Sequence, residues 1–481
     1  MTLTVGRRHS APCFAVLLLL AGCATTSPDT TPGSAAAPVP AQWHAPLPQD
    51  MAHGGDLADL SRWWAQFDDP LLLRLVEAGQ QVSATLAQAG ARIADARAAR
   101  TAAGAAGLPT LDAVASASRG RATPGEPVAT TSSVGLQASW ELDLFGAHRA
   151  GARAAQARLE SSRAGWHEAR VAVAAEVAST YVGLRACEAQ LVQTALDVRS
   201  RAETSRLTTL AANAGFQAPA AADLARASTA QGNAALTQQR AQCDIAVKSL
   251  VALTAVDEIA LRRELVAVTA LLPQPVALNV AAVPAVALAQ RPDIATAGRE
   301  LVAASADADQ AEAQRWPRIS LSGSIAAARL RSGGVSTDGN AWSIGPIAVT
   351  LPLFDAGVRR ANAKAARARY ASARVVYAAR LRTAVREVET ALVTLHSATA
   401  RGEDARTAVA GYERSYQATE ARYRGGLASL FELEDARRSL VGARSALIEQ
   451  QRESVIAWVD TYRAIGGGWG PTTTTADERT P

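Results

Sequence analysis

Two long segments of this 481-residue chain contain no proline, and they constrain the fold more than any other feature. The first extends from about Ala147 to Ala214 and the second from Ala356 to Arg424. A continuous helix of either length would extend for roughly 100 Å, at 1.5 Å per residue. Helices of that length do not fit inside one globular core, so we expect an elongated and mainly helical molecule.

The side chains along these segments predict close packing of long helices. Leu381, Val385, Val388, Leu392 and Leu395 recur at spacings of four and three residues, the pattern of a coiled-coil seam. Alanine, the best helix former, accounts for 111 residues, whereas aromatic residues make up only 5% of the chain. So few aromatic residues cannot fill a thick core. The 49 basic and 44 acidic residues nearly balance, so no strong field favours nucleic acid as a partner.

Short motifs recur along the chain at a nearly constant offset, which indicates two tandem structural repeats. Residues 108–111 are matched by 316–319, residues 142–145 by 351–354, and Gly215 by Gly426, at offsets of 208, 209 and 211 residues. Each half is predicted to run helix, strand, strand, long helix, turn and helix. We expect a first repeat at 56–264, a proline-containing linker at 265–285 and a second repeat at 286–465.

The strand pairs have the pattern of a sheet with one apolar and one polar face. Four strands are predicted, at about residues 109–121, 132–145, 317–330 and 341–354. The second alternates strictly between apolar and polar residues from Val134 to Leu144. In the fourth, the apolar residues change parity at Gly345-Pro346, which suggests a β-bulge. The loops 120–131 and 331–340 are rich in Gly, Ser and Thr, as hairpin ends are.

The predicted strands are long enough to cross a lipid bilayer. Tilted strands of ten or more residues can cross a bilayer, and strands are the remaining route because no later segment reads as a membrane helix. Four strands cannot close a membrane barrel, since known barrels begin at eight. Several chains would therefore share one barrel. The alternative is a soluble four-stranded sheet whose apolar face packs on a helix.

The N-terminus has the features of an export signal. Arg7 and Arg8 precede a short apolar run that ends in Leu20-Ala21-Gly22-Cys23. This ending resembles the bacterial lipobox, which implies a signal peptide at 1–22, cleavage before Cys23 and acylation of that cysteine. An ordinary signal peptide that happens to contain cysteine is the alternative. Residues 23–55 and the tail 466–481 are predicted to be flexible, because they are rich in small and polar residues or proline.

Two cysteines remain in the mature chain after Cys13 leaves with the signal and Cys23 is acylated. Cys187 and Cys243 lie on adjoining helices with Gly215 at their midpoint, so an antiparallel hairpin puts them at one height. We predict a disulfide between them in the oxidising periplasm. Two separate buried thiols are the alternative, because equal height does not guarantee the facing geometry that a disulfide needs.

The residues that enzymes require do not form a recognisable site in this sequence. The histidines are scattered with no pair at metal-ligand spacing, so no metal site is predicted. No glycine-rich phosphate loop follows a strand, and no nucleophile elbow is present. We therefore predict a protein that is not an enzyme and has no cofactor beyond the covalent lipid on Cys23.

An ordered set of motifs gives this chain a resemblance to a known family. The motifs lie at residues 64–70, 91–93, 108–111, 140–146, 291–294, 351–357, 423–426 and 435–436. In this order they resemble the TolC-like outer-membrane factor family, and within it the lipidated OprM/NodT-like branch. The resemblance covers essentially all of the mature chain.

The resemblance implies a mainly α fold with a membrane β-barrel part. Three chains would each give four strands to a twelve-stranded barrel in the outer membrane of a Gram-negative bacterium. The long helices would continue as an α-barrel through the periplasm. Such homotrimers are passive exit ducts that dock on a periplasmic adaptor and an inner-membrane transporter, often of the resistance-nodulation-division type. Outer membrane lipids would be a further partner, and nucleic acid would not.

The resemblance also implies a gate at the periplasmic tip. The tip turns would lie at Gly215 and at Gly425 and Gly426. Residues at gate or lumen positions of the family are matched here by Glu432, Asp435, Asp223 and Tyr423. Three chains would then form stacked acidic rings, which favour cations and repel one another. The alternative is a solvated helix face, because Glu434 and Arg437 show that charge is common nearby.

Three functions are compatible with these features. The leading hypothesis is the outer-membrane exit duct of a tripartite efflux pump for drugs or other small solutes. The second is a duct of the same fold that serves a protein-secretion system. The third is a lipid-anchored periplasmic coiled-coil scaffold without a pore, which would not need lipid-facing strands.

Overall fold

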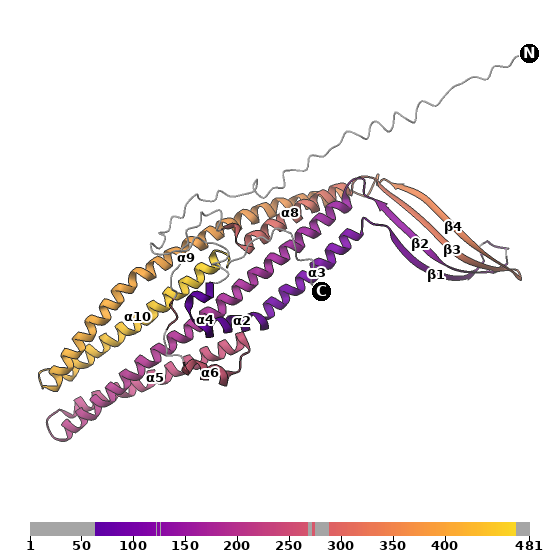
Figure 1. Ribbon diagram of the computed structural model, residues 1–481. Coiled ribbons are helices and arrows are strands. Elements are labelled where there is room, and N and C mark those ends of the chain that lie inside the picture. The colour runs from indigo at the N-terminus through magenta and orange to yellow at the C-terminus, as the bar shows by residue number, and fades with distance from the viewer. Residues whose placement is uncertain (1–62, 122, 126, 268–271, 275–287, 468–481) are drawn as a thin grey trace, which may run out of the picture.

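The computed structural model describes residues 63–121, 123–125, 127–267, 272–274 and 288–467. The predicted signal peptide, Cys23, the segment up to residue 55, most of the linker and the tail from residue 468 lie outside the described residues. The described chain is an elongated bundle of helices with a four-stranded sheet at one end (Figure 1).

The two halves of the chain have the same order of elements. The first comprises a 3-10 helix η2 (Trp63–Phe67), α2 (Pro70–Val82), α3 (Ala84–Ala105), β1 (Thr110–Gly120), β2 (Ala129–Leu142), α4 (Ala147–Asn213), α5 (Pro219–Thr254) and α6 (Glu258–Ala267). The second comprises α8 (Pro292–Ala313), β3 (Arg318–Ser332), β4 (Val335–Thr350), α9 (Val358–Arg424) and α10 (Leu430–Ala464). Helices α4 and α9 have 67 residues each, and α9 begins 211 residues after α4. The predicted repeat is therefore a structural one, and each long helix spans roughly 100 Å.

The corner between each strand pair and its long helix is fixed by an aspartate. The Asp143 carboxylate accepts hydrogen bonds from the backbone N–H groups of His148 and Arg149, at 3.1 and 2.9 Å. Asp355 accepts from the N–H groups of Gly357 and Arg359, at 3.0 and 3.1 Å. These carboxylates satisfy donors that the first turn of a helix leaves free. The residue just before each helix is a glycine with φ of +79° or +87°, a conformation that other residues adopt at a cost.

The sheet has the strand order β1-β2-β3-β4, and every neighbouring pair is antiparallel. β2 begins three residues earlier than predicted and ends three earlier, and β4 begins six residues earlier, at Val335. The predicted loop at 331–340 was wrong in length, because β3 and β4 are joined by Gly333 and Gly334 alone. Both glycines have positive φ, as a two-residue hairpin turn requires.

The bulge predicted at Gly345-Pro346 is confirmed by the strand register. Leu321 pairs with Ile347 and Gly323 pairs with Ile344, so one residue of β3 faces two residues of β4. The bulge keeps the apolar side chains of β4 on one face, although their parity along the chain changes.

The two faces of the sheet differ in chemistry. On one face, hydroxyl groups pair across strands: Thr110 with Ser139, Ser116 with Ser133, and Ser324 with Ser343, at 2.8, 2.8 and 2.9 Å. The opposite face, called the apolar face below, carries the other parity of each strand. Its large exposed side chains are Leu111, Val134, Leu136, Trp140, Ile325, Trp342, Ile344, Ile347 and Val349. An exposed apolar face of this size is typical of a surface that meets lipid.

The main hydrophobic core lies near the middle of the bundle, where the N- and C-terminal elements meet the long helices. The rings of Trp63 and Trp458 lie 5.4 Å apart, and Tyr462 lies 5.2 Å from Trp63 and 4.8 Å from Trp64. Trp63 is only 1% exposed. Many of the other buried helix positions are alanines, such as Ala150, Ala154 and Ala398.

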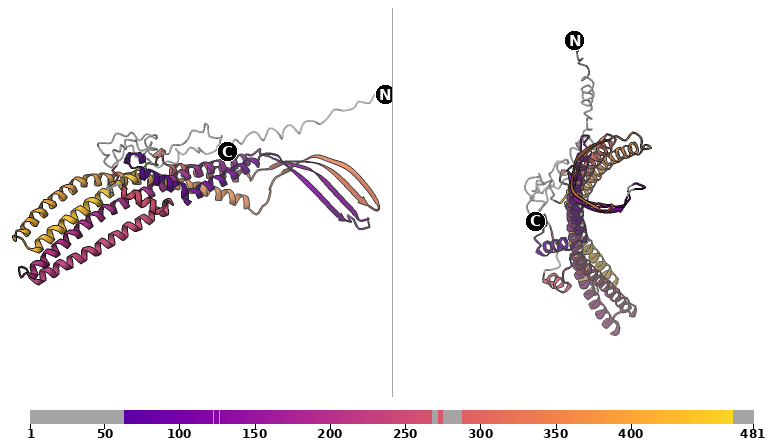
Figure 2. Two further views of the ribbon diagram at one scale, coloured as in Figure 1. Left: turned by 60° about the horizontal axis from the view of Figure 1, so that its bottom comes forward. Right: turned by 90° about the vertical axis from the view of Figure 1, so that its right-hand side faces the viewer.

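The molecule is curved about its long axis, as the two further views show (Figure 2). The sheet curls into an arc, and the helices follow the same direction of bending. None of the helices in the described ranges is both long and apolar enough to cross a membrane.

Candidate gate at the helix tips

The two helical hairpins end in the same turn, at the end of the bundle farthest from the sheet (Figure 1). In the first, the N–H groups of Gly215 and Phe216 donate to the carbonyls of Ala212 and Ala211, at 3.0 and 2.8 Å. The second repeats these bonds, from Gly426 to Tyr423 and from Leu427 to Arg422. This pair of bonds defines a Schellman motif, which needs a left-handed residue. Gly215 and Gly426 supply it with φ of +78° and +75°.

The tyrosine that matches a family gate residue joins the two hairpins. The hydroxyl groups of Tyr423 on α9 and Thr208 on α4 are hydrogen-bonded at 3.0 Å. The Tyr423 ring is half-buried and packs against a small cluster formed by Ala225, Leu430 and Leu433. A hydrogen bond and an apolar contact therefore hold α9 against the first hairpin close to the turn.

Two charged residues that the sequence placed on a solvated face are buried between the hairpins. Glu434 is 8% exposed and Arg437 is 3% exposed. They form an ion pair one turn apart on α10, and Arg437 also donates to the Thr204 hydroxyl of α4 at 2.8 Å. The Arg437 guanidinium lies 5.9 Å from the centre of the Tyr416 ring. Glu434 and Arg437 are therefore no sign of a solvated face, because α4 and α5 cover this side of α10.

The buried pair continues into a second pair on α4. Arg201 donates to Asp197 at 2.7 Å and to the Ser228 hydroxyl of α5 at 2.7 Å. Ser228 donates in turn to Glu434 at 3.0 Å, and Arg201 lies 3.7 Å from the same carboxylate. Two arginines and two carboxylates thus balance in one site, as buried charges require. We call Asp197, Arg201, Glu434 and Arg437 the tip charge cluster.

The predicted lumen residues lie on the exposed side of the tip. Glu432 forms a capping box with Ser429 at the start of α10, and it lies 3.6 Å from Arg422. The backbone N–H of Ser429 holds the pKa of Glu432 below its ordinary value of 4.5, with help from the Ser429 hydroxyl and Arg422. Asp435 is exposed, and it has no hydrogen bond or ion pair within the described part of the chain. Asp223 is exposed and pairs with Arg226 on its own helix. The lumen positions themselves stay a prediction.

The predicted disulfide is present between α4 and α5. The two sulfur atoms of Cys187 and Cys243 lie 2.07 Å apart and the Cα atoms 5.5 Å apart. The side-chain amide of Gln239 donates to the Cys187 carbonyl at 3.2 Å, so the hairpin is also hydrogen-bonded there. Among the described residues, no group of three His, Cys, Asp or Glu is placed to hold a metal ion.

The architecture defines a class of protein: a channel component with membrane strands at one end and long helices that reach away from the membrane. The sequence profile described as outer membrane efflux protein matches residues 75–256 and again 283–467. The two matches fall on the two repeats. The chain belongs to the outer membrane efflux protein family, in its OprM/NodT-like branch, and it is an outer-membrane efflux channel of a Gram-negative bacterium.

Curated relatives match over nearly the whole length. Nodulation protein T of Rhizobium leguminosarum bv. viciae is 30% identical, and the match covers 95% of this chain and 93% of the relative. The toluene efflux pump outer membrane protein TtgI of Pseudomonas putida is also 30% identical, with 96% of this chain and 98% of the relative covered.

Solved structures share the fold. The outer-membrane channel OprN superposes with a TM-score of 0.77 at 28% identity, covering 91% of this chain and 99% of OprN. The open state of the Neisseria gonorrhoeae MtrE outer membrane channel gives a TM-score of 0.74 at 25% identity, with 91% and 98% covered.

The tip charge cluster generates the first prediction. Glu434→Ala leaves the buried Arg437 and the half-buried Arg201 without their shared carboxylate, so we expect a loss of about 3–5 kcal/mol in the free energy of unfolding. Glu449 and Arg452 form an ion pair of the same spacing on the same helix, but with side chains 50% and 35% exposed. Glu449→Ala is therefore the matched control and should cost at most about 1 kcal/mol. Chemical denaturation monitored by circular dichroism measures both, and equal losses would contradict the cluster's role.

The disulfide generates the second prediction. Replacing both cysteines with alanine releases a loop of 56 residues in the unfolded chain, which corresponds to about 4 kcal/mol of stability in the chain-entropy description. Wild-type protein unfolded under reducing conditions should match the double variant. Thiol titration of denatured, unreduced mature protein should find no free thiol, and two free thiols per chain would disprove the bond.

Proposed function

We propose that three copies of this chain form a passive exit duct that a periplasmic adaptor and an inner-membrane transporter, of the resistance-nodulation-division type, load with small solutes. The observation that carries the proposal is the open sheet. β1 and β4 are the edge strands of a four-stranded sheet whose outer side is apolar. Inside a bilayer, the unpaired backbone groups of an edge strand cost several kcal/mol each.

Joining β4 of one copy to β1 of the next removes both edges. Three copies supply twelve strands, an even number within the range of known outer-membrane barrels. The same operation places three pairs of helical hairpins side by side, which supports a helical tube below the barrel. The curvature of the single chain supports such a ring (Figure 2).

The relatives support the direction and the cargo of transport. TtgI is the outer membrane protein of a toluene efflux pump, and it matches this chain over almost its full length. We infer a cargo of small, weakly polar solutes on that basis. A lipid on Cys23 would anchor the chain in the membrane, and a protein-secretion duct of the same fold remains the second candidate.

The acidic residues at the tip would give this duct its ion preference. Asp435 has no described partner, whereas the charge of Glu432 is partly offset by Arg422. In a ring of three copies, the field of Asp435 would therefore act on permeating ions more strongly than that of Glu432.

The trimer generates the third prediction. Protein purified from outer membranes in mild detergent should have the mass of three mature chains, each with a lipid-modified N-terminal cysteine, by native mass spectrometry. Planar bilayers containing it should show stepwise conductance. Deletion of the gene should raise intracellular accumulation of small apolar dyes and leave the secreted proteins unchanged. A monomer without channels contradicts the duct, and a loss of secreted proteins alone favours the second candidate.

The acidic tip generates the fourth prediction. Asp435→Asn should lower the cation-to-anion permeability ratio more than Glu432→Gln, as measured from reversal potentials in a salt gradient. Because the hydrogen bonds of Ser429 lower the pKa of Glu432, its carboxylate keeps its charge to a lower pH than an ordinary glutamate does. The ratio in the Asp435→Asn variant should therefore fall only in acid, at a lower pH than the ionisation of a free glutamate would give. An unchanged ratio in both variants would show that these residues do not face the lumen.

A further inference from the structure

The apolar face of the sheet has a charged border at one end only. Along β2 the apolar side chains run from Leu142 to Val134, about 27 Å of strand and about 20 Å of height when tilted as barrel strands are. The next two residues of the same parity are Ser132 and Thr130. The apolar band therefore ends just before the hairpin turns, which lie at the end of the sheet farthest from the helices (Figure 1).

Three arginines stand on this border. The register places Arg119 of β1, Thr130 of β2 and Arg331 of β3 in one row across the strands. The row below it contains Arg329, which makes a bidentate ion pair with Asp338 of β4 at 2.6 and 3.0 Å. All of these side chains project from the same face as Val134, since paired residues and residues two apart share a face.

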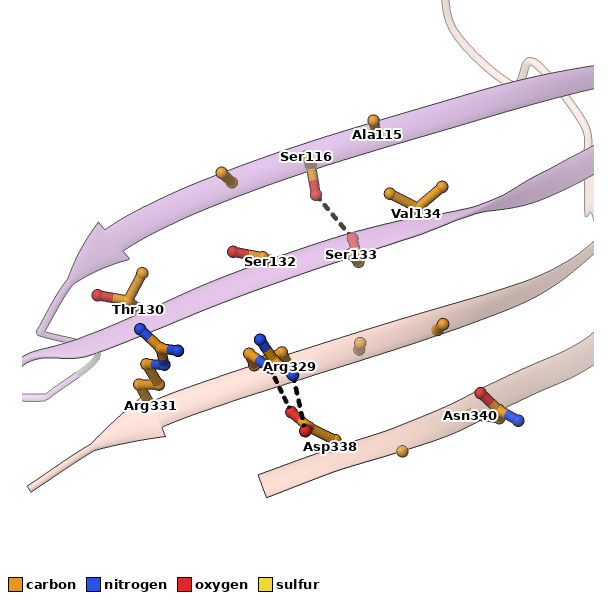
Figure 3. Close-up of a pocket in the computed structure, with 14 residues that line it drawn as sticks. Ala115, Ser116, Thr130, Ser132, Ser133, Val134, Arg329, Arg331, Asp338 and Asn340 are labelled. Carbon is orange, nitrogen blue, oxygen red and sulfur yellow. Dashed lines mark hydrogen bonds and ion pairs between the residues drawn. The ribbon is translucent and has the colours of Figure 1, made fainter. Parts of the chain in front are cut away.

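Two of the three arginines form no ion pair within the described part of the chain, although Asp338 lies close enough to Arg331 to feel its charge. Arg119 and Arg331 are exposed and make no hydrogen bond or ion pair with any residue that the structure describes. Figure 3 shows Arg329 turned to Asp338, with Arg331 beside it and the hydroxyls of Ser132 and Thr130 in the same hollow. The hollow has a volume of about 750 Å³. It combines the Arg331 guanidinium with hydrogen-bonding hydroxyls directly above an apolar wall, and Arg119 lies in the same row of residues just outside its lining.

The opposite end of the apolar face has a different chemistry. There the strands present Leu111, Trp140, Leu142, Ile319 and Val349, and no charged side chain of the described strands lies on this face at that end. A generic need for charge at a membrane boundary would place it at both ends. The asymmetry instead matches the outer membrane of Gram-negative bacteria, whose outer leaflet carries the denser uncompensated negative charge, because each lipid A has two phosphates and no cation, whereas the phosphates of the inner leaflet belong mostly to zwitterionic phospholipids.

We propose that Arg119 and Arg331 bind the two phosphates of lipid A, the glycolipid of the outer leaflet, with Ser132 and Thr130 contacting its sugars. The two arginines stand two strand spacings apart, about 10 Å, so each can engage a different phosphate. Guanidinium groups bind phosphate through two parallel hydrogen bonds. The acyl chains would lie on the apolar face below. This site rests on the proposed placement of the strands in the outer membrane.

The test compares two double variants in the full-length protein. Arg119→Gln/Arg331→Gln removes the unpaired cations. Arg318→Gln/Arg360→Gln is the matched control, because both residues are exposed, have no described partner and lie at the helix end of the sheet. Purified diphosphoryl lipid A is titrated into each protein in detergent, and the bound lipid is counted by native mass spectrometry.

We expect the first variant to bind lipid A about thirtyfold more weakly than wild type, and the control to bind it as wild type does. When monophosphoryl lipid A replaces diphosphoryl lipid A, most of the difference in affinity between the two double variants should disappear. Neither phosphatidylglycerol nor millimolar inorganic phosphate should compete. Asp338→Asn, which frees Arg329, should strengthen binding.

Equal affinity of the two double variants for lipid A would overturn the site, as would equal competition by phosphatidylglycerol. Conductance separates this outcome from a failure of the duct itself. The Arg119→Gln/Arg331→Gln variant should retain wild-type channels, whereas absence of channels in the wild type would contradict the proposed function and not this site alone.

Discussion

Backbone hydrogen bonding inside a lipid bilayer is the constraint on which the rest of this structure depends. Lipid offers no partner to a free N–H or C=O group, so a strand pair can enter the membrane only as part of a closed sheet. Each repeat of this chain supplies one hairpin, and the register joins the two hairpins through β2 and β3. The edges that remain, β1 and β4, would pair with those of neighbouring copies in the proposed trimer, where the chain is one part of a wall and not a self-contained domain.

The same constraint explains the division of side chains along the molecule. The sheet needs large apolar side chains on one face, whereas a thin helical wall needs small ones between its helices. The alanine-rich α4 and α9 meet their neighbours through residues such as Ala154, Ala174, Ala384 and Ala398, all at most 1% exposed. One cluster of aromatic residues, Trp63, Trp458 and Tyr462, packs together at the middle of the bundle. That cluster fixes the terminal elements to helices that have little core of their own.

Much of this architecture could be predicted because it rests on local patterns. The duplication, the four strands, the bulge at Gly345-Pro346 and the pairing of Cys187 with Cys243 all follow from spacing along the chain. The errors lie where tertiary contacts decide. The strand β4 extends to Val335 because its polar residues pair with β3, and ladder pairing does not depend on hydropathy.

The tip charge cluster was missed for a related reason. Glu434 and Arg437 have the spacing of an exposed helix pair, and nothing along α10 indicates that another hairpin covers them. Asp197 and Arg201 form a similar pair within α4, but their distance in residues from the turn at Gly215 differs from that of Glu434 and Arg437 from the turn at Gly426. Spacing along the chain therefore does not show that the two pairs lie side by side, and a single sequence does not show which helix faces meet.

The composition of this cluster would suit the gate that is proposed at the tip. Asp197 and Arg201 are bonded within α4, and Glu434 and Arg437 are bonded within α10, so each hairpin is electrically balanced by itself. Separation of the hairpins would break the bonds of Ser228 to Glu434 and of Arg437 to Thr204, together with the 3.7 Å contact of Arg201 with Glu434, and would leave intact the ion pair within each helix. Water would replace those few interactions between the hairpins. Separation of a charge from its only partner would instead leave an uncompensated ion. Removal of one carboxylate by mutation is therefore costly in this cluster, whereas a concerted movement of whole hairpins costs comparatively little. A tip of this kind would pack in one defined arrangement when closed and would still be able to open.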